Sequence, residues 1–200
     1  MKGKDVNNQA VYQRSTISYL LLAALMAAVC AVCSWISIPL PFTPVPINLG
    51  TLAVFLAGGI LGWKYGSISV IVFVLLGAAG LPVFHGFTGG MGIITGPTGG
   101  YIAGYIIAAF LTGIMIDTYF KARRSAESKA VTYAVLALAM ALGLFACYAL
   151  GTAWFMHISG TGLKASLLMC VVPFLIGDAI KIAAASVLVR KLRPFVKKQA

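Results

Sequence analysis

Apolar stretches close to the length of a membrane-spanning helix recur along almost the whole sequence. About 20 apolar residues are needed for a helix to cross the roughly 30 Å hydrocarbon core of a bilayer. Hydrophobic residues make up 60% of the chain and charged residues only 10%, whereas soluble domains carry about 25% charged residues. A chain of this composition cannot cover itself with polar surface. We therefore expect an all-α integral membrane protein, folded as a single membrane domain over residues 1–200.

Two connections between the apolar stretches are unsuited to a helix. Segment 38–47 contains four prolines, and proline does not fit the interior of a helix. Segment 80–101 contains eight glycines and no charged side chain, so it has to bend repeatedly. These breaks and the polar loops divide the chain into six predicted transmembrane helices, at about 17–37, 48–61, 66–79, 100–120, 130–151 and 166–189.

The basic residues are unevenly distributed, which accounts for the formal net charge of +11. Lys and Arg are in excess in the cytoplasmic loops of membrane proteins. With both termini in the cytoplasm, nearly all of them fall on the inner side, Lys164 lies outside and Lys181 lies within a span. This distribution predicts cytoplasmic N- and C-termini and an outward-facing site near the proline and glycine segments. It also removes the need for a nucleic-acid partner.

A pair of charged residues is expected deep within the last span. Asp178 and Lys181 are three residues apart and share nearly one helix face. Each isolated charge there would cost about 2.5 to 3.5 kcal/mol on insertion scales. A mutual salt bridge is one explanation. We favour a polar ligand that uses the lysine as cation and the aspartate as acceptor, because an ion pair buried for stability alone gains little.

Other chemistry finds little support in the sequence. His85 and His157 lie outside any metal-ligand spacing, and no phosphate-binding glycine-lysine loop is present. The pair Cys30 and Cys33 lies in an apolar helix and is interpreted as packing. Asp117 is assigned no function, because it can pair with Lys121 four residues later. We expect neither a metal nor a cofactor, and no hydrolysis of ATP by this chain through such a loop.

The first span carries small residues four positions apart, which allow another helix to approach closely. The partner helix belongs either to this chain or to another protein, and the sequence leaves both open. These residues are Ala23, Ala24, Ala27, Ala28 and Ala31.

Four phrases occur in order between about Ala23 and Pro194. They are Ile38-Pro-Leu-Pro-Phe-Thr-Pro-Val-Pro-Ile47, Gly80-Leu-Pro-Val-Phe84, Gly96-Pro-Thr-Gly-Gly-Tyr101 and Pro173-Phe-Leu-Ile-Gly-Asp-Ala-Ile-Lys181. Together they resemble the BioY family, the biotin-binding S components of energy-coupling factor (ECF) transporters.

The resemblance implies a six-helix S-component bundle in the cell membrane of a bacterium or archaeon. Such a protein captures biotin at the outer face with high affinity for uptake and is not an enzyme. The implied partners are a transmembrane coupling subunit and two cytoplasmic ATPase subunits, besides the lipid bilayer. The alanines of the first helix are then implied to dock on the coupling subunit.

Biotin has a carboxylate at one end and a ureido ring at the other. With this ligand, Asp178 is assigned to the ureido N–H donors, since a charged acceptor makes a strong hydrogen bond, and Lys181 to an anionic or carbonyl oxygen. No arginine lies between Gly80 and Tyr101 to meet the carboxylate, so Lys181 or backbone donors would have to do so. Further candidate binding residues are Asn48, Phe84, Gly90, Thr95, Thr98, Tyr101 and Trp154.

Two alternatives stay open at this point. An S component could bind another small vitamin or polar heterocycle through the same pair. A multispan membrane enzyme could use Asp178 and Lys181 as an acid and a base, but no second acidic residue is expected at comparable depth.

Overall fold

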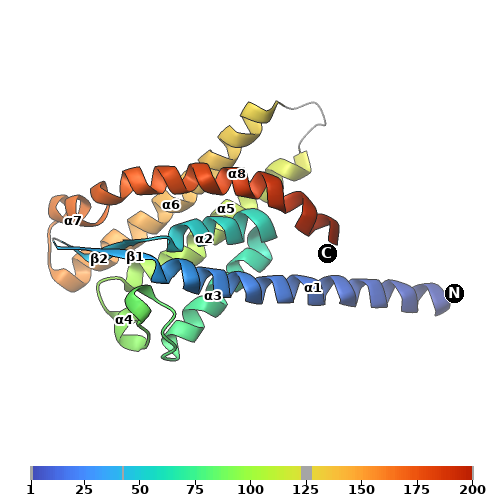
Figure 1. Ribbon diagram of the computed structural model, residues 1–200, viewed down its shortest axis with the longest axis horizontal. Helices are drawn as coiled ribbons and strands as arrows, with labels where there is room; N and C mark the ends of the chain where they lie inside the picture. The colour runs from blue at the N-terminus through green and yellow to red at the C-terminus, as the bar shows by residue number, and fades with distance from the viewer. Residues whose placement is uncertain (1, 42, 123–127, 200) are drawn as a thin grey trace.

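The computed structural model describes residues 2–41, 43–122 and 128–199. The chain is mostly helical, and long helices lie side by side in one bundle (Figure 1). Both termini lie at one end, and α1 extends beyond the bundle there. The helices are α1 (Lys2–Trp35), α2 (Gly50–Leu56), α3 (Gly62–Ala78), α4 (Met91–Thr95), α5 (Gly99–Ala122), α6 (Lys129–Ser159), α7 (Leu163–Cys170) and α8 (Leu175–Gln199), with short irregular turns η1 (Ala57–Leu61), η2 (His85–Phe87) and η3 (Val172–Phe174).

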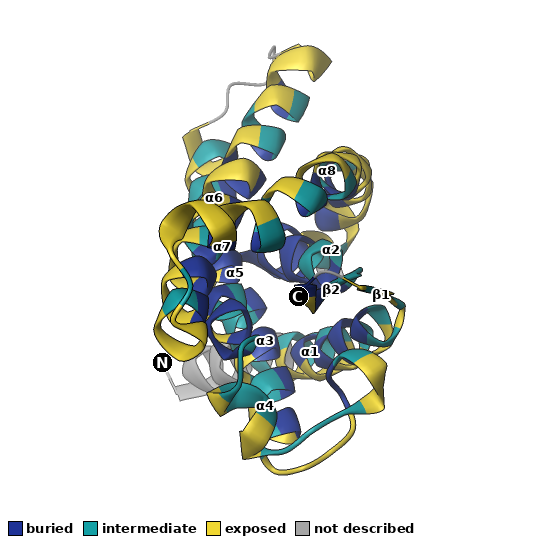
Figure 2. Ribbon diagram, turned by 90° about the vertical axis from the view of Figure 1, so that its left-hand side faces the viewer, coloured by how far each residue is buried: buried dark blue, intermediate teal, exposed yellow. Residues whose placement is uncertain are grey.

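Among the described residues, five helical segments are long and apolar enough to cross a membrane, so the chain is a multi-pass membrane protein. Their outward faces are largely exposed and apolar, while buried residues face one another inside the bundle (Figure 2). The segments are Thr16–Trp35, Gly50–Ala78, Gly99–Ala122, Lys129–Ser159 and Leu163–Lys198. The sequence predicts six spans instead, because it divides 50–78 into two.

Segment 50–78 is bent at Gly62, whose backbone has φ 87° and ψ 179°. An L side chain rarely adopts this conformation, so glycine is the residue that permits the bend. The preceding turn η1 is a π-helix. Beyond Gly62 the chain turns back, so α3 runs roughly opposite to α2 (Figure 1). Gly66 makes the close return possible, since a Cβ there would overlap the backbone of Ala57 and Gly58.

The proline-rich segment forms an antiparallel hairpin of β1 (Ser37–Leu40) and β2 (Thr43–Asn48), with Ser37 opposite Asn48. Together with α4 and α7 it lies at the end of the bundle away from the termini (Figure 1). The last span is interrupted at η3, which contains Pro173, because proline cannot continue the helical hydrogen bonding. Pro173 therefore breaks the last span.

A polar cluster lies near the C-terminal ends of α5 and α8. The carboxylate of Asp117 accepts from the guanidinium of Arg193 and from the backbone N–H of Trp63, 3.0 Å away. Arg193 also donates to the carbonyl of Gly59. Asp117 thus pairs with Arg193 rather than with Lys121, because tertiary packing brings α8 to it. The cluster joins α3, α5, η1 and α8.

Candidate functional site

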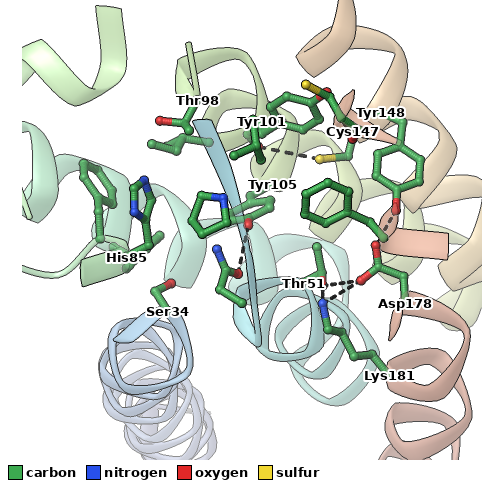
Figure 3. A pocket seen from close by; sticks show the side chains of 18 residues that line it. Ser34, Thr51, His85, Thr98, Tyr101, Tyr105, Cys147, Tyr148, Asp178 and Lys181 are labelled. Atoms are coloured by element: carbon green, nitrogen blue, oxygen red, sulfur yellow. Dashed lines mark hydrogen bonds and ion pairs between the residues drawn. The ribbon is translucent and has the colours of Figure 1, made fainter. Parts of the chain in front are cut away.

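A pocket opens at the end of the bundle that carries the β-hairpin. Residues from β2, α2, α3, the 79–98 connection, α5, α6, α7, η3 and α8 line it, together with Ser34 at the end of α1. Polar side chains lie on opposite sides of it, with aromatic rings between them (Figure 3). A pocket with an apolar body and a few convergent polar groups is typical of small-molecule binding.

One side of the pocket is formed by the charged pair of α8. Asp178 is 2% exposed and Lys181 is 7% exposed, so both charges are buried. The Nζ of Lys181 donates to Oδ1 of Asp178 at 2.7 Å and to Oγ1 of Thr51 at 3.0 Å. The Thr51 hydroxyl donates in turn to Oδ1 of Asp178 at 3.0 Å. The predicted mutual salt bridge therefore exists, and the same pair lines the pocket.

A tyrosine completes the surroundings of Asp178. The hydroxyl of Tyr148, on α6, donates to Oδ2 of Asp178. Nearby, the Oδ1 of Asn48 accepts from the backbone N–H of Gly50 at 2.8 Å and from the hydroxyl of Tyr105 at 3.4 Å. The carboxylate thus has donors from three elements, which fix its position before any ligand binds.

Aromatic side chains form the apolar middle of the pocket. Phe73 and Phe84 meet edge to face, with ring centroids 5.4 Å apart. Gly77 gives the Phe84 ring its place, since a Cβ there would overlap the ring. Tyr101 and Phe174 also line this part. The Tyr101 hydroxyl is 3.1 Å from that of Thr152, so its polar end is satisfied by the protein.

The far side of the pocket carries His85 and Thr98 (Figure 3). The Nε2 of His85 is buried and has no hydrogen-bond partner among the described residues. Burial lowers the pKa of this imidazole below its ordinary value, which favours the neutral form. A buried polar atom without a partner in a pocket wall is available to a ligand.

The predicted site residues divide into two groups. Asn48, Phe84, Thr98, Tyr101, Asp178 and Lys181 all line the pocket. Gly90, Thr95 and Trp154 lie outside its lining. Thr95 is exposed and donates to the carbonyl of Met91 at 3.0 Å. The indole of Trp154 is turned to the backbone instead, donating to the carbonyl of Gly96 at 3.0 Å.

Sequence reasoning missed Thr51, Tyr105 and Tyr148, and it considered His85 only as a metal ligand. Thr51 and Tyr148 reach Asp178 from 127 and 30 residues away in the chain. In the sequence, each of these three residues shows only as an isolated hydroxyl group within an apolar span. Such residues also occur where they merely bond to the preceding turn, as Ser69 does at 2.7 Å from the carbonyl of Tyr65.

The alanines of α1 lie on different faces of that helix. Ala23, Ala27 and Ala31 are buried inside the chain, at 2%, 3% and 7% exposure. Ala24 and Ala28 are exposed. The buried alanines serve internal helix packing, whereas Ala24 and Ala28 face outward.

Comparisons with known proteins agree with this architecture. A curated biotin transporter BioY from Thermotoga maritima is 38% identical over 174 residues, covering 87% of this chain and 95% of the relative. One from Lactococcus lactis subsp. cremoris is 35% identical over 188 residues, covering 94% and 93%. The crystal structure of an S component for biotin from an ECF-type ABC transporter superposes with a TM-score of 0.80 at 33% identity, covering 94% of each chain. The model of the BioY family matches residues 6–198, and the chain belongs to this family.

Proposed function

We propose that this chain captures biotin in its pocket and takes it up as the S component of an ECF-type transporter. Membership of the BioY family supports this function. The observation that carries it is the buried Asp178–Lys181 pair, which lines an apolar pocket while its own charges are already balanced. Capture and release of an unchanged ligand need no catalytic group, so the chain acts as a binding subunit rather than an enzyme.

The unused hydrogen-bonding capacity of the pair suits the ureido ring. A carboxylate offers about four lone-pair sites, and Asp178 accepts from Thr51, Lys181 and Tyr148. An ammonium carries about three donors, and Lys181 uses two of them in the described contacts. Asp178 can therefore accept a ureido N–H while Lys181 donates to the ureido carbonyl. The rings of Phe73, Phe84 and Phe174 would surround the apolar body of biotin.

The proposed membrane topology rests on the bend at Gly62. If α2 with η1 crosses in one direction and α3 returns, the chain has six crossings and both termini lie on one side. The common position of the termini supports this arrangement (Figure 1). The basic residues Lys121, Lys129, Arg190 and Arg193 lie toward the inner ends of the predicted spans, and an excess of such residues favours the cytoplasm. The pocket then faces the outside of the cell membrane.

The partners of such a subunit are a transmembrane coupling protein and two cytoplasmic ATPases. The exposed alanines of α1, Ala24 and Ala28, are small enough to let a partner helix approach closely. This contact would lie on the face of α1 next to the internally packed alanines.

Equilibrium binding of labelled biotin to the purified protein tests the function. We expect saturable binding that unlabelled biotin competes away and that other vitamins do not. Lys164→Ala is a control variant that should bind biotin as the parent does, because Lys164 is exposed and outside the pocket. Failure of the parent protein to bind biotin would overturn the proposal, and competition by another vitamin would assign that vitamin instead.

A further inference from the structure

His85 has an unsatisfied polar atom at a place where a ligand would pass. Its Nε2 is buried, has no partner among the described residues, and belongs to a side chain that lines the pocket. Buried polar atoms in native proteins nearly always have a partner, and an exception calls for a ligand, a water or a functional role. The position in the pocket wall makes a ligand the natural partner.

The backbone around His85 is held by a tight turn. Residues 84 and 88 pair across a tight turn, and Thr88 Oγ1 donates to the carbonyl of His85 at 2.7 Å. The turn includes Gly86 at φ 64° and Phe87 at φ 57°. The Phe87 ring stacks on Trp35 with centroids 5.0 Å apart, which ties the turn to the end of α1. The backbone that carries His85 is therefore fixed at the pocket before a ligand arrives.

The two polar sides of the pocket differ in charge. Asp178 and Lys181 balance each other on one side. His85 and Thr98 lie across the pocket from them (Figure 3). Among the described lining residues, Lys181 and His85 are the only side chains with a basic nitrogen, and burial favours the neutral form of His85. A ligand carboxylate beside Asp178 would meet a like charge, whereas near His85 it would meet a donor.

We propose that Nε2 of His85 donates a hydrogen bond to the carboxylate of the ligand and so sets the preference of the pocket for an acid at that end. This assignment rests on the proposed function, because it takes biotin as the ligand with its ureido ring at Asp178. The hydroxyl of Thr98 is the neighbouring polar group on the same side. The neutral imidazole with its proton on Nε2 is sufficient, since it is then a donor.

A comparison of two ligands with four variants tests the role of His85. The ligands are biotin and an analogue in which a methyl group replaces the carboxylate. We expect the parent to bind biotin at least tenfold more tightly than the analogue. His85→Leu should lose most of that ratio by weakening biotin binding, with the affinity for the analogue nearly unchanged. His85→Gln should restore part of the ratio, because an amide N–H can donate.

Controls separate this role from the shape of the pocket and from misfolding. His157→Leu changes the other histidine, which is exposed and outside the pocket, and should leave the ratio as in the parent. His85→Ala gives the same comparison if the leucine variant does not fold. If the ratio of the two affinities in His85→Leu equals that of the parent, or if both ligands lose affinity equally, the assignment of His85 is wrong. The proposed function would stand in either case. Absence of biotin binding in the parent would overturn the proposed function and this inference together.

Discussion

Two ion pairs among the described residues each join an aspartate to a basic side chain but differ in their surroundings. Asp178 and Lys181 lie on one helix and face a pocket. Asp117 and Arg193 come from different helices and are bonded further to backbone groups of α3 and η1. In the first pair some donor and acceptor capacity remains unused. In the second the protein itself uses the charges to join helices.

This difference separates recognition from assembly. Removing one partner of a buried pair leaves an uncompensated charge, whichever pair it is. In the pocket pair, Thr51 bonds to both Lys181 and Asp178, and Tyr148 bonds to Asp178, so at least one hydroxyl stays beside whichever charge remains. The Asp117–Arg193 pair, with its bonds to the backbone of Trp63 and Gly59, joins α5, α8, α3 and η1. We therefore expect substitutions in the Asp117–Arg193 pair to lower mainly the stability of the protein. Substitutions in the Asp178–Lys181 pair should lower mainly its affinity for biotin.

The largest effect is expected for Asp117→Ala. Arg193, whose side chain is 6% exposed, would lose its carboxylate partner, and breaking a buried pair in this way costs about 3 to 5 kcal/mol. Thermal unfolding in detergent measures the loss. Adding Arg193→Met should recover part of the stability because the orphaned charge is removed. Equal stability of Asp117→Ala and the parent would contradict an assembly role.

The next effect is expected for Asp178→Asn, which keeps the shape of the side chain and removes its charge. We expect biotin affinity to fall by about 10- to 100-fold, since a hydrogen bond to a charged group contributes about 1.5 to 3 kcal/mol. Isothermal titration calorimetry measures the affinity. If Asp178→Asn loses as much stability as Asp117→Ala and keeps its affinity for biotin, the pair in the pocket has a structural role instead of a binding role.

A smaller effect is expected for Tyr148→Phe, which removes the hydroxyl that donates to Asp178. Because Tyr148 positions the carboxylate without itself contacting the ligand, we expect biotin affinity to fall by less than in Asp178→Asn. The same titration measures it. A loss larger than that of Asp178→Asn would mean that Tyr148 contacts the ligand directly instead of positioning the carboxylate.

The smallest effect is expected for Lys197→Ala. Its Nζ is 4.0 Å from Oδ1 of Asp117 and its side chain is 39% exposed, and exposed pairs of this kind contribute about 0 to 1 kcal/mol. Thermal unfolding should therefore change little from the parent. A destabilisation close to that of Asp117→Ala would show that the cluster around Asp117 and Arg193 depends on the exposed Lys197.

The membrane-protein class and the charged pair of α8 could be predicted from the sequence because both depend on local features. Apolar length reveals a span, and a spacing of three places Asp178 and Lys181 together before any tertiary contact is known. The break at Pro173 is local in the same way. These features were predictable from the sequence alone.

Other features depend on contacts between distant segments. Arg193 lies 76 residues beyond Asp117, so spacing favoured Lys121 as its partner. Thr51 and Tyr148 meet Asp178 only after three helices have packed. The proline segment pairs with itself as a hairpin, which its prolines do not favour. Trp154 was a candidate binding residue, but its indole bonds to the backbone outside the pocket.

The most direct test is the rise in melting temperature that saturating biotin produces in three proteins. A ligand that binds only the folded state stabilises it by mass action. The account predicts a clear rise in the parent, a rise of similar size in Asp117→Ala from a lower starting temperature, and a clearly smaller rise in Asp178→Asn at the same biotin concentration. A full rise in Asp178→Asn would contradict the claim that the pocket pair of α8 recognises the ligand.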